Sequence, residues 1–87
     1  MSSYILLRKY EIHHYSLIDN LWVVHRDGAP AVICGDVEYW YQYGLCHRED
    51  GAAIVAPDKA YWFWRGKFIT CESQKLFEQL VKIRNFW

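Results

Sequence analysis

The amino-acid sequence predicts an α+β fold: a small antiparallel β-meander of hairpin repeats about 22 residues long, with a C-terminal helix packed on one face. Three observations predict it. The phrase His-Arg-acid-Gly occurs twice, beginning at His25 and at His47. Runs of β-branched and aromatic residues alternate with turn residues after each copy. Beyond Gly66 the apolar residues change to helical spacing. The 87 residues are expected to form a single domain, 1–87.

Residues 1–24 are predicted to form an N-terminal segment and a degenerate half-repeat. The stretch "YILLRKYEIHHYS" favours a strand that pairs with the first hairpin, with a short helix as the alternative. The stretch "LIDNLWVVHR" (17–26) aligns with "YWYQYGLCHR" (39–48). A degenerate unit is expected at this position, because terminal repeats cap a stack and are atypical.

The two full repeats are 25–46 and 47–69. The first reads "HRDGAPAVICGDVEYWYQYGLC" and the second begins "HREDGAAIVAPDKAYWFWRGKF". In each, "AVI" or "AIV" is β-forming, "CGDV" or "APDK" is turn-like, and "EYWYQY" or "AYWFWR" alternates sides with a period of two. A Tyr-Gly or Arg-Gly turn follows, where glycine can take a positive φ. Each repeat is therefore predicted to be a hairpin, and stacking makes a marginal hairpin stable.

The repeated His-Arg phrase is predicted to form structural corners between hairpins rather than an active site. The corner residues are His25, Arg26, Asp27, Gly28, His47, Arg48, Asp50 and Gly51. Asp-Gly is expected to make each turn, and each arginine to pair with a nearby acid or lie over an aromatic ring. A nuclease that uses His25 and His47 as acid and base is the enzymatic alternative. Repeated structure explains repeated residues without chemistry, so no catalytic residue is predicted.

The segments "HRDGAPAVI", "EYWYQYGLCHREDGAAIV" and "AYWFWRGKFI" resemble MORN-like β-hairpin repeats, which read "LHREDGPAVI…WYLNGKLHREDGPA". Such repeats occur in small proteins of tailed bacteriophages and some bacteria. The resemblance covers about residues 17–70 and implies a hairpin-repeat fold and a phage or bacterial source, with no shared catalytic chemistry. Two departures stand out. The usual Asn-Gly turn is Tyr43-Gly44 and Arg65-Gly66 here, and Ala52-Ala53 replaces Pro-Ala.

Residues 70–87 are predicted to form an amphipathic helix. Leu76, Phe77, Leu80 and Val81 recur at helical spacing. Thr70 or Ser73 can cap its start, with Glu72 nearby, and Lys82 and Arg84 lie near its end, where cations are favoured. The apolar stripe is expected to pack on a sheet face. A helix offered to a partner is the alternative.

Composition excludes several classes of protein. The chain is 53% hydrophobic and 18% aromatic, which excludes global disorder. Ten basic and ten acidic residues balance, which argues against a general nucleic-acid binder. Cys34, Cys46 and Cys71 are expected to be free thiols in a cytoplasmic protein, since the chain shows no signal peptide and no transmembrane stretch. No metal-ligand quartet and no cofactor motif is found.

Partner binding is assigned to the aromatic strands. Alternation places Tyr39, Tyr41 and Tyr43 on one face, with Tyr61, Phe63 and Arg65 as their counterparts. One helix covers one face at most, so the other is exposed, covered by the N-terminal segment or buried in an interface. A two-sided core with exposed tips is one interpretation, and an exposed aromatic patch, which usually marks binding, is the other.

The predicted function is that of a small, non-enzymatic, phage-type accessory protein. It is expected to bind and inhibit a bacterial host protein, such as a component of a defence or host-metabolism system. One alternative is binding of single-stranded nucleic acid through an aromatic face, which the neutral charge disfavours. The other is a homo-oligomer or virion component joined through open sheet edges.

Overall fold

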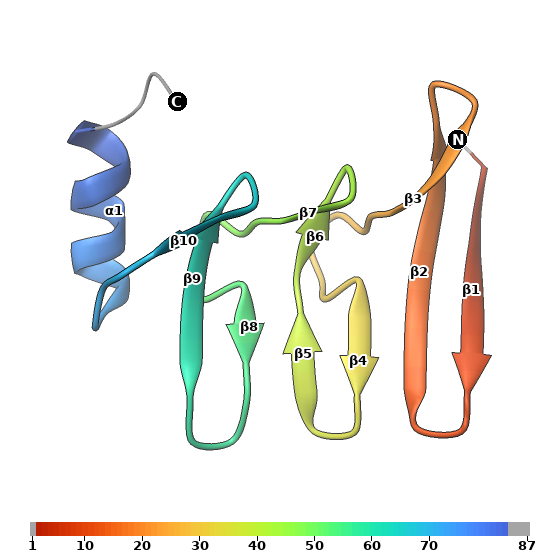
Figure 1. Cartoon of the computed structure of the whole chain (residues 1–87), viewed down its shortest axis with the longest axis horizontal. Coiled ribbons are helices and arrows are strands. Elements are labelled where there is room, and N and C mark those ends of the chain that lie inside the picture. Colours follow the sequence, from red (N-terminus) through yellow and green to blue (C-terminus); the bar gives the residue numbers. More distant parts are fainter. Residues whose placement is uncertain (1, 84–87) are drawn as a thin grey trace.

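The computed structural model describes residues 2–83, within which ten short strands precede one helix (Figure 1). The strands are β1 (Ser3–Arg8), β2 (Glu11–Ile18), β3 (Leu21–Val24), β4 (Val32–Cys34), β5 (Val37–Tyr39), β6 (Tyr41–Gln42), β7 (Leu45–Cys46), β8 (Ile54–Val55), β9 (Ala60–Trp64) and β10 (Lys67–Ile69). The helix is α1 (Gln74–Ile83). The fold class is α+β, as predicted, and the N-terminal segment forms strands rather than a helix.

The strands form an antiparallel sheet in the order β1-β2-β4-β5-β8-β9-β10, with β3 paired to β2 and β6 paired to β7. Three hairpins, β1–β2, β4–β5 and β8–β9, lie side by side (Figure 1). A short crossing strand follows each of them: β3, β7 or β10. The first two crossing strands lead into the next hairpin, and β10 leads into α1. The arrangement is the meander-like sheet that the sequence predicts.

The turns before the crossing strands share one conformation. Both central residues have positive φ in Asp19-Asn20 (51° and 65°), Tyr43-Gly44 (53° and 79°) and Arg65-Gly66 (48° and 82°). These values match the type I′ turn, whose twist suits antiparallel strands. The positive φ predicted for the two glycines is confirmed. Tyr43 and Arg65 also adopt it, which is uncommon for side chains of their size.

The aromatic stretch 38–43 does not form one continuous strand. β5 ends at Tyr39 and β6 begins at Tyr41, because the N–H of Trp40 between them donates to the Ala53 carbonyl of the next hairpin (2.7 Å). Tyr43 then lies in a turn. The prediction that Tyr39, Tyr41 and Tyr43 share one strand face is therefore wrong. Arg65 likewise occupies a turn and not a strand face.

Strand register divides the main sheet into two faces, because antiparallel Cα partners project on the same side. One side, here called the open face, carries Tyr4, Leu6, Arg8, Glu11, His13, Tyr15, Leu17, Trp22, Val24, Val32, Cys34, Val37, Tyr39, Ile54, Tyr61, Phe63 and Phe68. The other side, here called the helix-side face, includes Ile5, Leu7, Ile12, His14, Ile33, Glu38, Val55, Trp62 and Trp64.

The helix α1 packs against the last hairpin, and its Gln74 Nε2 also donates to the Glu49 carbonyl of the second corner (3.0 Å). Ser73 caps it, since its Oγ accepts the N–H of Leu76 (3.2 Å). Phe77 is fully buried, and its ring centroid lies 6.4 Å from that of Trp64. The indole Nε1 of Trp62 donates to Gln74 Oε1 (2.8 Å). The predicted packing on a face thus holds at β9 alone, because α1 lies beyond the last strands instead of over the sheet (Figure 1). The predicted helix residues 84–87 lie outside the described range.

The interior is thin, because no second layer covers the sheet within residues 2–83. The shortest dimension is 17 Å, and the buried apolar residues are mostly small: Ala31, Val32, Ala52, Ala53, Ile69 and Phe77. Of the larger side chains between residues 2 and 83, Phe77 is the one that is fully buried. None of the helical structure in that range is long and apolar enough to cross a membrane.

Candidate functional site

The two corner histidines make matching contacts. His25 Nδ1 accepts the N–H of Tyr43 (3.0 Å), and His47 Nδ1 accepts the N–H of Arg65 (2.9 Å). Because Nδ1 is the acceptor, each neutral ring carries its proton on Nε2. That atom lies 3.3 Å from Asp27 in the first corner, and 3.8 Å from the carboxylate of Glu49 in the second. Each histidine therefore ties its corner to the turn before the following crossing strand.

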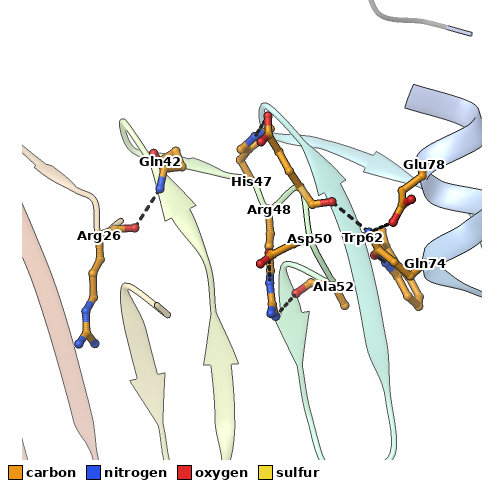
Figure 2. A network of polar contacts seen from close by, with 10 residues as sticks. Arg26, Gln42, His47, Arg48, Asp50, Ala52, Trp62, Gln74 and Glu78 are labelled. Atoms are coloured by element: carbon orange, nitrogen blue, oxygen red, sulfur yellow. Dashed lines mark hydrogen bonds and ion pairs between the residues drawn. The ribbon is translucent and has the colours of Figure 1, made fainter. Parts of the chain in front are cut away.

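The first corner arginine is held by its own neighbours. Arg26 Nη1 donates to His14 Nε2 (3.0 Å) and to the Pro30 carbonyl (3.2 Å). Its own carbonyl accepts from Gln42 Nε2 (2.9 Å; Figure 2). Burial and the nearby guanidinium both lower the pKa of His14, so its ring stays neutral and able to accept.

The second corner arginine combines an acid partner with an aromatic one. Arg48 Nε donates to Asp50 Oδ1 (2.9 Å) and Nη1 donates to the Ala52 carbonyl (3.1 Å; Figure 2). Its Cζ lies 3.7 Å from the centroid of the Trp40 ring, within cation–π range. Both expected contacts therefore occur at Arg48. The hydrogen bond from Arg48 also holds the pKa of the Asp50 carboxyl below its ordinary value.

The two corner glycines serve different purposes. Gly28 has a φ of +74° and open space around it, as the predicted Asp-Gly turn requires. Gly51 has no positive φ. A Cβ there would lie 2.7 Å from Arg48 Cζ. The chain bends at residues 49–51, as the predicted corner requires, but with a backbone conformation that differs from that at Gly28. Gly51 gives the Arg48 guanidinium room to lie over Trp40.

A groove of about 760 Å³ lies between the two corners and is here called the corner groove. It is lined by Asp27, Gly28, Trp40, Gln42, Tyr43, Leu45, His47, Arg48, Glu49, Asp50 and Arg65. The apolar side chains of Tyr43 and Leu45 are 65% and 49% exposed. The lining thus joins accessible apolar groups to charges of both signs.

Electrostatics keeps one histidine of the groove neutral. Burial lowers the pKa of His47, and the Arg65 charge lowers it further. The Glu49 carboxylate opposes this shift without cancelling it. A neutral His47 preserves the acceptor that Nδ1 offers to the Arg65 backbone. The position of this hairpin turn therefore depends on the proton state of one ring.

The structure separates the six residues predicted to bind a partner. Tyr43 and Arg65 line the corner groove. Tyr39, Tyr61 and Phe63 lie on the open face. Tyr41 lies half-buried in the separate β6–β7 pair, where burial raises the pKa of its phenol.

Of the eight corner residues, five line the groove: Asp27, Gly28, His47, Arg48 and Asp50. His25 is buried, and Arg26 and Gly51 lie outside the lining.

Sequence reasoning missed four lining residues: Trp40, Gln42, Leu45 and Glu49. One signal was present for the tryptophan. Trp occurs at the same place in both repeats, and a corner arginine follows eight residues after Trp40. An aromatic ring that contacts an arginine of the next corner is expected to line the space between the two corners.

Residues that could bind a metal do not gather in the described part of the chain. No group of three His, Cys, Asp or Glu side chains comes together between residues 2 and 83. The three cysteines are free, and burial raises the pKa of Cys46 to about 11. That thiol stays protonated at neutral pH and is a weak nucleophile.

The chain was compared with known protein families, curated proteins and solved structures. No protein-family model, no curated protein and no solved structure matches the chain.

Proposed function

We propose that the protein is a small non-enzymatic binding module that recognises another protein through the corner groove. One observation carries the proposal: the lining combines a tryptophan, a tyrosine and two arginines, Trp40, Tyr43, Arg48 and Arg65. These three residue types dominate the energetics of protein interfaces. Tyr43 and Leu45 are exposed and well placed to contact an apolar side chain of the partner.

The charges of the groove favour a polypeptide over a nucleic acid. The carboxylates of Asp27, Glu49 and Asp50 accompany the two arginines, and Arg48 is already paired with Asp50. A phosphate backbone needs a predominantly basic surface. A protein segment with an apolar anchor and polar groups of both signs complements the groove better.

The recurrence of corner bonds supports the repeat that underlies this proposal. The bonds to the histidine Nδ1 atoms recur at a step of 22 residues, as do those from Ala31 and Ala53 to the carbonyls of Tyr39 and Tyr61. We infer two units, 25–46 and 47–69. In that scheme the histidines and arginines hold hairpins together, which accounts for their repetition without catalysis.

The nature of the partner rests on the resemblance to MORN-like hairpin repeats of bacteriophages and bacteria. A small phage protein acts in the cytoplasm of the infected cell. We therefore propose that the partner is a bacterial host protein, such as a component of a defence system, and that binding inhibits it. The neutral net charge of the chain allows specific contact without general adhesion to polyanions.

The test is capture followed by reconstitution. The wild-type chain and two variants are each immobilised separately. Leu45→Arg changes the groove, and Leu7→Arg on β1 is the control, because Leu7 is also exposed but lies outside the groove. Wild type and Leu7→Arg are expected to retain one stoichiometric protein from bacterial lysate. Leu45→Arg is expected to bind that purified protein at least about tenfold more weakly by calorimetry. Equal binding by both variants would contradict the groove as the contact surface.

The non-enzymatic part of the proposal has its own test. Purified chain is incubated with RNA and DNA, alongside His47→Asn. No cleavage above background is expected from either protein. If the wild type cleaves nucleic acid and the variant does not, the hypothesis of a nuclease with histidine acid–base catalysis would be supported instead.

A further inference from the structure

We infer that the open face is the interface of a homodimer in which two copies stack their sheets face to face. Within residues 2–83 the main sheet is a single layer, and α1 packs on Trp62 and Trp64, which project from the opposite face. Stable domains bury a sheet against a second layer. No segment between residues 2 and 83 supplies that layer for the open face, and a second copy would.

The surface area fits an interface of standard size. The chain exposes 6115 Å². A compact monomer of 10.5 kDa is expected to expose about 5,400 Å². The excess of roughly 700 Å² is close to the roughly 800 Å² per partner that a standard protein interface buries. The dimensions of 35 × 32 × 17 Å are those of a flat molecule with two broad faces.

The chemistry of the open face is self-complementary. Aromatic clusters lie at both ends: Tyr4 contacts Tyr15 and Trp22 at one end, with ring centroids 4.9 and 4.7 Å apart. At the other end the Phe68 ring lies 6.1 Å from Tyr61 and 5.5 Å from Phe63. Under a two-fold axis that lies between the sheets and runs parallel to the strands, each cluster meets the other aromatic cluster of the second copy.

Charge also favours a second copy over other occupants. Among the residues that register places on the open face, Arg8 and Glu11 carry a formal charge, and the two are cross-strand partners at the end of the β1–β2 hairpin. Stacking two such faces buries no unmatched charge. A single-stranded nucleic acid would stack on the rings but would find one arginine for its phosphates. The chain has no net charge, so two copies do not repel.

The dimer is independent of the proposed function. The corner groove and the open face share no residue. A dimer that binds no partner would remove the groove proposal alone, and a monomer that binds a partner would remove the dimer alone.

The experiment is light scattering coupled to gel filtration on the full chain, from about 1 to 100 μM, together with sedimentation equilibrium. Wild type is expected to show twice the 10.5 kDa mass at the upper end, with dissociation on dilution. Phe68→Glu and Trp22→Glu, at opposite ends of the open face, are expected to raise the dissociation constant at least about thirtyfold. Leu7→Glu is the matched control, because Leu7 is 71% exposed on the helix-side face.

Each outcome is decisive when circular dichroism shows that the variants are folded. A wild-type monomer at 100 μM would overturn the inference. A dimer that survives both open-face variants, or one that Leu7→Glu disrupts to the same degree, would place the interface elsewhere, for example at the β1 edge. Two variants are used so that the loss of fold in one leaves the other informative. Quenching of tryptophan fluorescence by oligouridylate, abolished by Phe68→Glu, would assign the face to nucleic acid instead.

Discussion

Replacing Gly51 with alanine tests how the second corner is built. The new Cβ would lie 2.7 Å from Arg48 Cζ and 3.0 Å from Nε, so the guanidinium has to move off the Trp40 ring. The change sacrifices a cation–π contact worth about 0.5–2 kcal/mol. It also weakens the charged hydrogen bond to Ala52, worth about 1.5 kcal/mol. The bond to Asp50 adds little, because that carboxylate is 81% exposed.

Part of this cost is offset by the unfolded state, which loses freedom when glycine becomes alanine. That gain is about 0.4–1 kcal/mol where the native φ suits alanine, as at Gly51. The net destabilisation by Gly51→Ala is therefore expected to be about 1–2 kcal/mol. For a chain of this length it lowers the Tm by roughly 4–16 °C. Urea and thermal unfolding, followed by tryptophan fluorescence at one fixed protein concentration, measure it.

The decisive comparison repeats Gly51→Ala in an Arg48→Ala background. Without the guanidinium the Cβ meets no obstacle, so the second substitution is expected to be neutral or to stabilise the protein. The coupling free energy between the two sites is then about 1–3 kcal/mol. Gly28→Ala is the control, because its φ of +74° makes it costly by about 1 kcal/mol with or without Arg26. Equal cost of Gly51→Ala in both backgrounds would refute the steric reasoning.

Three further predictions follow from the same contacts. Folding lowers the pKa values of His14 and His47 from their ordinary value of 6.5, so the unfolded state binds more protons in acid. The free energy of unfolding is therefore expected to fall as the pH drops below about 6.5 and to be constant just above it. Urea titration at a series of pH values measures it. Gln74→Ala leaves the Trp62 indole without its acceptor and is expected to cost about 1–2 kcal/mol by thermal unfolding, whereas alanine at an exposed helix position costs little. Cys46 is expected to resist iodoacetamide at pH 8, as followed by mass spectrometry, while the exposed cysteine of β4 reacts.

Local signals predicted most of the strands. Runs of β-forming residues mark β4 and β8, alternation of period two marks β9, and the glycines at 44 and 66 mark two of the turns before the crossing strands. Such features depend on neighbours in the chain, so the sequence carries them directly. The equal step between the two His-Arg phrases also indicated equivalent corners, and the bonds to His25 and His47 are equivalent in the structure.

The division of the aromatic stretch at Trp40 could not be predicted in this way. Its cause is tertiary: the Trp40 N–H bonds to Ala53, and the Trp40 ring receives Arg48 from the following corner. The corner groove depends on the same long-range contacts, so a pattern within one strand misassigned Tyr41 and Tyr43. Gly51 shows the same limit, since the letters Asp-Gly do not reveal whether a turn or a neighbouring guanidinium requires the glycine.

The place of the helix explains why the open face is bare. In each hairpin unit an aromatic ring contacts a polar side chain from the segment that follows the crossing strand. Arg26 contacts His14, Arg48 contacts Trp40, and Gln74 contacts Trp62. The last of these comes from α1, so the helix takes the position where a further corner would stand. It ends the series of hairpins and does not form a second layer. Because the helix takes this place, nothing between residues 2 and 83 covers the open face, and the second copy inferred above would supply that layer.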